Sequence, residues 1–61
     1  MNNLKAVRES KGVSQLELAK YLDVTQGAIS SWEVGRNAID STLLTRIAEY
    51  LDVTVDQILG V

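Results

Sequence analysis

The sequence predicts an all-α fold of five short helices. Apolar residues recur at three- and four-residue steps, residues suited to helix caps stand before these stretches, and no segment is predicted to form a strand. The chain has 61 residues, which is enough for one domain. This length is close to the lower limit at which a chain can form a stable core without disulfides or metals. The expected helices cover residues 3–11, 15–22, 26–33, 42–51 and 55–59.

The helix expected over residues 3–11 starts at a cap residue, either Asn2 or Asn3. Its apolar residues Leu4 and Val7 are expected to face the core. Gly12 is suited to end the helix, because glycine adopts the left-handed backbone conformation without strain.

The helix expected over residues 15–22 has a well-marked start. Ser14 can accept a hydrogen bond from the amide three residues on while Glu17 reaches back to the Ser14 amide, which is a capping box. Leu18, Ala19 and Leu22 share one face, which should be buried. The small side chain of Ala19 indicates that another helix crosses closely there.

A four-residue turn, 22–25, separates this helix from the next one, over residues 26–33. Asp23 is expected in the left-handed conformation, and Thr25 is expected to cap the following helix. Ile29 and Trp32 are expected to face the core, Trp32 in preference to stacking on single-stranded nucleic acid. Two helices joined by such a turn have helix-turn-helix geometry. The other face of the second helix carries small, amide or hydroxyl groups, which suit base edges in a major groove: Gln26, Gly27, Ser30 and Ser31.

The helix expected over residues 42–51 has the strongest periodicity in the chain, and Asp40 or Ser41 can cap it. Its apolar stripe consists of Leu44, Ile47, Ala48 and Leu51.

The last expected helix, 55–59, follows a second capping box of Thr54 and Gln57 and stops at Gly60. Ile58 should be buried. Leu59 or Val61 should be available for dimerisation.

Composition excludes most enzymatic and metal chemistry. Without cysteine or histidine the chain cannot build a disulfide, a zinc finger or a thiol nucleophile, and it lacks the commonest metal ligand and general base. Its carboxylates are not clustered at helical spacing, so no catalytic constellation, metal site or cofactor is expected. Nothing resembles a signal peptide or a membrane span, so a cytoplasmic location is expected.

The net charge of −2 and the pI near 4.8 argue at first against nucleic acid. The charges are unevenly distributed, however. Residues 1–36 hold five basic and four acidic side chains, whereas residues 37–61 hold one basic and four acidic side chains. If the acidic half faces away from DNA, the overall charge is no objection to binding.

The ordered motifs along the chain resemble the phage-repressor and Cro family of bacterial regulators, also called the xenobiotic-response-element family. The resemblance covers nearly the whole chain and implies a compact lambda-repressor-like fold. One departure is the absence of proline before the fourth helix, where this chain has Ile39-Asp40. The resemblance is carried by Leu4, Val7-Arg8, Lys11-Gly12, SQLELA at 14–19, Ile29-Ser30, Trp32-Glu33, Gly35-Arg36 and LLTRIAEYLDVTVDQIL at 43–59.

The resemblance also implies roles for individual residues. Gln26, Gly27 and Ser31 match base-contacting positions, with Ser30 at the margin; the alternative is an ordinary solvated helix face. Arg8 and Glu33 match a partly buried ion pair that fixes the recognition helix to the scaffold. The implied phosphate-contacting residues are Ser14, Gln15, Val34, Arg36 and Asn37; the alternative for Arg36 is a solvated surface charge.

The function implied is sequence-specific binding of double-stranded DNA by a transcriptional regulator of bacterial or phage-encoded type, most often a repressor. The expected form is a homodimer on a palindromic operator. A rival hypothesis is a protein-interaction module, such as an antitoxin or a regulator that masks a partner, which the acidic second half of the chain favours.

Overall fold

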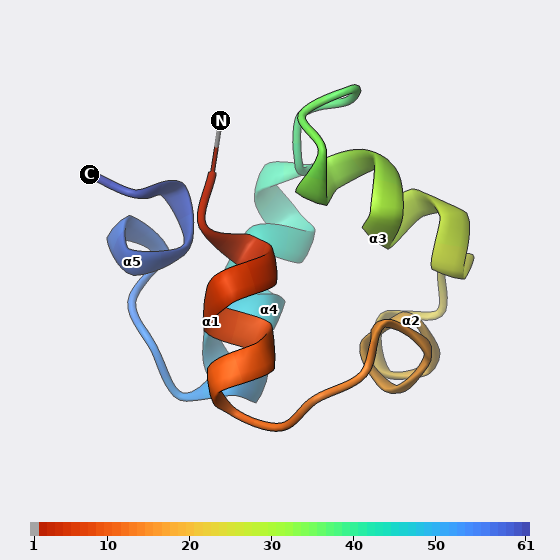
Figure 1. The fold of residues 1–61 in the computed structure, drawn as a ribbon, viewed down its shortest axis with the longest axis horizontal. Helices are drawn as coiled ribbons and strands as arrows, with labels where there is room; N and C mark the ends of the chain where they lie inside the picture. The colour runs from red at the N-terminus through yellow and green to blue at the C-terminus, as the bar shows by residue number, and fades with distance from the viewer. Residues whose placement is uncertain (1) are drawn as a thin grey trace.

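Five helices make up the computed structural model, which describes residues 2–61 and contains no strand in that range (Figure 1). This confirms the all-α, five-helix fold. The second, third and fifth helices have the predicted bounds, the first is one residue shorter at each end, and the fourth starts one residue earlier. The helices are α1 (Leu4–Ser10), α2 (Gln15–Leu22), α3 (Gln26–Glu33), α4 (Ser41–Leu51) and α5 (Val55–Leu59).

Most helix starts use the predicted caps. The side chains of Thr25 and Asp40 accept hydrogen bonds from the amides of Ala28 and Thr42, and Thr54 forms the predicted capping box with Gln57. These bonds satisfy amides that have no partner within the helix.

The capping box predicted at α2 is only half formed. Ser14 Oγ accepts from the Glu17 amide at 2.9 Å, but the Glu17 carboxylate accepts from the Tyr50 hydroxyl instead of reaching back to the Ser14 amide. The Glu17 carboxylate, which the local pattern predicted to cap α2, is therefore bonded to a hydroxyl on α4.

A seven-residue pattern occurs twice, which the sequence prediction overlooked. Ala-X-Tyr-Leu-Asp-Val-Thr spans residues 19–25 and 48–54. Asp23 (φ 58°, ψ 46°) and Asp52 (φ 57°, ψ 49°) have nearly the same left-handed backbone angles. Equivalent amide-to-carbonyl bonds of 3.0 Å follow each turn, from residue 24 to 19 and from residue 53 to 48. The α2–α3 and α4–α5 turns are therefore the same local structure built from the same sequence.

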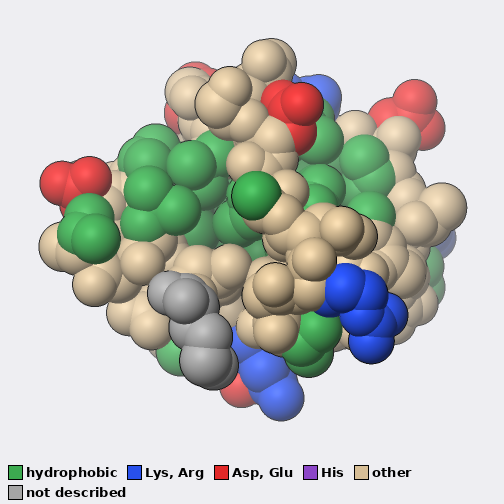
Figure 2. Space-filling model, turned by 90° about the horizontal axis from the view of Figure 1, so that it is seen from above, with side chains coloured by type: hydrophobic (Ala, Val, Ile, Leu, Met, Phe, Trp, Pro, Cys, Tyr) green, Lys and Arg blue, Asp and Glu red, His purple; other side chains and the backbone are tan. Residues whose placement is uncertain are grey.

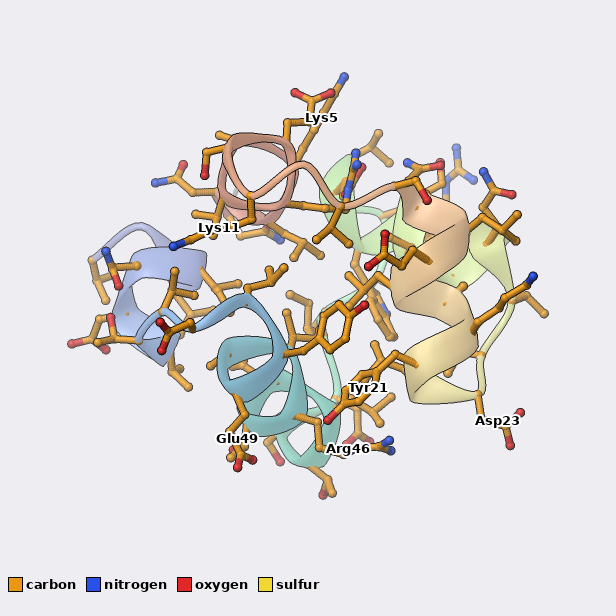
Figure 3. The ribbon with its side chains drawn as sticks, turned by 90° about the horizontal axis from the view of Figure 1, so that it is seen from below. Lys5, Lys11, Tyr21, Asp23, Arg46 and Glu49 are labelled. Carbon is orange, nitrogen blue, oxygen red and sulfur yellow. The ribbon has the colours of Figure 1, made fainter. Side chains whose placement is uncertain are left out.

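The tyrosines of this repeat join α2 to α4. The Tyr21 and Tyr50 rings stack with their centroids 4.2 Å apart. The Arg46 guanidinium lies 5.3 Å from the Tyr21 ring centroid and donates to the Tyr21 carbonyl at 3.1 Å (Figure 3). The Arg46 side chain on α4 thus contacts Tyr21 on α2 and contributes to the packing of these two helices.

The core lies between the helices and receives side chains from all five. Ile58 is fully buried as predicted, and Trp32 is 7% exposed. In contrast, Leu59 and Val61 are exposed. The buried apolar residues are Leu4, Leu18, Ala19, Leu22, Ile29, Trp32, Ile47, Ala48, Leu51 and Ile58.

Within residues 2–61, no helix is long and apolar enough to cross a membrane.

Candidate nucleic-acid interface

One side of α3 is fixed in the core and the other side is open to solvent. Ile29 and Trp32 are buried on the inner side. Gln26, Gly27 and Ser30 are exposed, and Ser31 is half-buried at the edge. The exposed side therefore offers an amide, a bare stretch of backbone and a hydroxyl, without a charged group.

A buried ion pair holds the C-terminal end of α3 to α1. Arg8 Nε donates to Glu33 Oε2 at 2.6 Å and Arg8 Nη2 donates to Glu33 Oε1 at 3.3 Å. Arg8 Nη1 also donates to the Val13 carbonyl at 2.7 Å, in the loop before α2. The hydrogen bond to Glu33 raises the pKa of Arg8, because the carboxylate stabilises the charged guanidinium. One side chain therefore ties α1, α3 and the α1–α2 loop together.

Gln15 extends this ion pair to the first residue of α3. Gln15 Nε2 donates to Glu33 Oε1 at 2.8 Å, and Gln26 Nε2 donates to Gln15 Oε1 at 3.3 Å. The side chain of Gln15 is therefore bonded inside the protein at both its nitrogen and its oxygen, so the phosphate contact predicted for Gln15 rests on its backbone amide. Its backbone N–H, in the first turn of α2, has no intrahelical partner and stays suited to phosphate.

A second anchor of α3 lies at Asn2, which the sequence indicated only as one of two candidate caps of α1. Its Nδ2 donates to the Trp32 carbonyl at 2.9 Å, and its Oδ1 accepts from the Leu4 amide at 3.0 Å. The side chain of Asn2, rather than that of Asn3, therefore caps α1. The same side chain secures the last turn of α3.

The remaining predicted phosphate-contacting residues surround the open face of α3. Ser14 is exposed at the start of α2, and Val34 is 60% exposed just after α3. Arg36 and Asn37 are exposed, while their backbone amides donate to the Ser31 carbonyl at 2.9 and 3.4 Å. These bonds and the left-handed Gly35 (φ 79°) shape the loop that presents both side chains.

The two helix pairs that contain the repeated turn, α2–α3 and α4–α5, differ in their charged side chains. The α4–α5 half carries the acidic side chains Glu49, Asp52 and Asp56, all exposed, and its basic residue Arg46 is bound to Tyr21. Its second helix has five residues, against eight in α3. Phosphate would be repelled by the acidic half, so α3 is the better candidate for contact with a polyanion.

Comparison with known proteins identifies the family. A model described as helix-turn-helix matches residues 4–58. The chain belongs to this helix-turn-helix family. Within the match, the helix-turn-helix is formed by α2, the turn at Asp23 and α3.

Several relatives of this helix-turn-helix domain are named as regulators. It is 36% identical over 57 residues to the HTH-type transcriptional activator BcrR of Enterococcus faecalis, which covers 93% of this chain and 28% of BcrR. It is 36% identical over 56 residues to an SPbeta prophage-derived uncharacterized HTH-type transcriptional regulator, YonR, of Bacillus subtilis (strain 168), which covers 92% of this chain and 52% of YonR. The uncharacterized HTH-type transcriptional regulator YqaE of the same organism is 35% identical over 57 residues, 93% of this chain and 49% of YqaE.

The chain therefore spans between 28% and 52% of the length of these three relatives. All three names describe transcriptional regulators, and one of them describes an activator.

Proposed function

We propose that this domain binds double-stranded DNA sequence-specifically by placing α3 in the major groove, and that it regulates transcription. The observation that carries the proposal is the open, uncharged face of Gln26, Gly27 and Ser30 on a helix whose other side is held by the core and by the Arg8–Glu33 pair. The names of the three relatives support it.

The base contacts come from the exposed face of α3. Gln26 stands at the start of the helix, and a glutamine amide can pair in bidentate fashion with adenine. Gly27 has open space where a side chain would project, since an added Cβ would meet only Thr25 Oγ1 at 3.8 Å. The bare backbone at this position lets the helix approach the bases. Ser30 and the half-buried Ser31 supply hydroxyl groups further along the groove.

Phosphate contacts come from both sides of α3. The helix start at Ser14 and Gln15 offers free amides to one strand, while Arg36 and Asn37, with the backbone near Val34, contact the other. Because Arg36 is the basic side chain among these five residues, the salt dependence of binding should be shallow.

A homodimer would double the contact area on a palindromic operator, with half-sites roughly 34–36 Å apart. Hydrophobic side chains gather on the face that carries the C-terminal end of the chain (Figure 2). Leu59 (38% exposed) and Val61 (86% exposed) belong to this end of the chain. A hollow next to the α3–α4 loop is lined by Asn2, Gly35, Asn37, Ala38, Ile39 and Leu59. Because this surface adjoins the loop after α3, two copies joined here would keep their recognition helices on one side. A dimer so placed over a promoter would block polymerase in the cytoplasm, as a repressor.

Selection from random DNA tests the proposal. Bound duplexes are enriched, sequenced, checked for inverted repeats, and then used in gel shifts with Gln26→Ala. That variant should lose preference at one base pair per half-site, at a cost of about 1–3 kcal/mol. Thr42→Ala is the control, because it truncates an exposed polar side chain on α4, away from the proposed DNA interface.

Unchanged base preference in Gln26→Ala would show that the recognition residue is wrongly assigned. Absence of any salt-dependent DNA binding, together with copurification of a basic protein, would instead favour a regulator that masks a partner.

A further inference from the structure

A chain of hydrogen bonds runs from the core to the first residue of the proposed recognition helix. It passes from Arg8 to Glu33, from Glu33 to Gln15, and from Gln15 to Gln26. The Glu33 side chain is 3% exposed and Gln15 is half-buried, whereas Gln26 is exposed. The chain therefore connects a buried charge to a side chain at the surface.

The direction of these bonds follows from the chemistry of the carboxylate. An ionised carboxylate only accepts hydrogen bonds, so the Gln15 group that faces Glu33 must be its NH₂. A reversed Gln15 would place its carbonyl oxygen against the buried carboxylate, with no proton between the two acceptors. The Gln15 Oε1 then faces Gln26 as an acceptor, so Gln26 must donate to it through its own Nε2.

This direction decides what Gln26 can offer to DNA. One N–H of Gln26 is used by Gln15, which leaves Oε1 as an acceptor and the second N–H as a donor. An acceptor beside a donor complements the N6 amino group and N7 of adenine. If Gln26 were reversed, both of its N–H groups would be free, and two donors complement O6 and N7 of guanine.

We propose that Glu33 and Gln15 are positioning residues that set the direction of the Gln26 amide and thereby its preference for adenine over guanine. This inference rests on the proposed DNA-binding function. A buried carboxylate outside the DNA interface would thus act on sequence specificity through two glutamines.

The test compares affinities for two duplexes that differ only by adenine or guanine at the base pair where Gln26→Ala loses preference. Fluorescence anisotropy gives the adenine-to-guanine ratio of affinities for the wild type and each variant. In Glu33→Gln, the new amide gives its oxygen to Arg8 and its NH₂ to Gln15, which reverses both glutamines. The ratio should fall by about tenfold or more.

Gln15→Leu leaves the ion pair in place and frees Gln26 to turn either way, so its ratio should also fall, by a smaller factor. If Glu33→Gln does not fold, the ratio in Gln15→Leu tests the inference on its own. Glu17→Gln is the matched control, because it makes the same change of charge on α2 outside the hydrogen-bond chain, and its ratio should equal that of the wild type. General destabilisation weakens binding to both duplexes and does not move the ratio.

A wild-type ratio in Gln15→Leu, and in Glu33→Gln where it folds, would overturn the inference while leaving the proposed function intact. A wild type that prefers guanine at this base pair would overturn it as well. If the wild type shows no preference for any base at any position of the selected DNA, the proposed function itself fails.

Discussion

Replacing Arg8 by alanine should destabilise the domain by about 3–5 kcal/mol. The change removes two hydrogen bonds to Glu33, at 2.6 and 3.3 Å, and one to the Val13 carbonyl at 2.7 Å. It leaves the Glu33 carboxylate, whose side chain is 3% exposed, with Gln15 Nε2 as its remaining side-chain donor. A domain of 61 residues has a total stability of about 3–9 kcal/mol, so this loss is a large part of the whole.

Urea titration measures the loss, with the fluorescence of the buried Trp32 as an internal probe. Lys5→Ala is the control, because Lys5 is an exposed basic residue on the same helix and its loss should change stability by less than about 0.5 kcal/mol. The double variant Arg8→Met with Glu33→Leu should recover most of the stability, because no buried charge is left unpaired. A loss below about 0.5 kcal/mol in Arg8→Ala would refute the buried ion pair as an anchor of α3.

Two further variants, Gly27→Ala and Tyr50→Phe, test the close approach of α3 to DNA and the pH dependence of the free energy of unfolding. Gly27→Ala should stabilise the domain by about 0.4–1 kcal/mol, because its helical backbone suits alanine and the new Cβ meets only Thr25 Oγ1 at 3.8 Å. The same variant should bind selected DNA more weakly in a gel shift, and wild-type affinity would contradict the close approach of α3 to the bases. The hydrogen bond to Glu17 raises the pKa of Tyr50, so its contribution to stability is complete below about pH 10 and is lost as the pH rises through the raised value. Urea midpoints of Tyr50→Phe should fall less steeply above pH 10 than those of the wild type; equal slopes would show that the bond contributes nothing.

The sequence predicted the helix ends and turns well because these depend on neighbouring residues. The left-handed Asp23 and the Thr25 cap each depend on residues within a few positions along the chain. The Thr54–Gln57 capping box is equally local. The repeated Ala-X-Tyr-Leu-Asp-Val-Thr pattern was also visible in the sequence, and comparing the two segments would have predicted the left-handed Asp52.

Contacts between helices could not be predicted in the same way. The partners of Gln15 are 18 and 11 residues away, and the Tyr50 hydroxyl reaches a carboxylate 33 residues away. Whether such side chains meet depends on the crossing of the helices, which local spacing does not give. For this reason the sequence assigned the Glu17 carboxylate to a helix cap and did not indicate the hydrogen bonds of the Gln15 side chain. The candidate base-contacting residues came from the family resemblance together with the uncharged face of α3.

The central claim is that the open face of α3 contacts DNA. Amide chemical shifts of isotopically labelled protein, followed by nuclear magnetic resonance during titration with the selected duplex, test it most directly. The account predicts that the largest changes fall on residues 26–31, at the start of α2, and at Arg36 and Asn37. Changes confined to α4 and α5, with α3 unaffected, would contradict it.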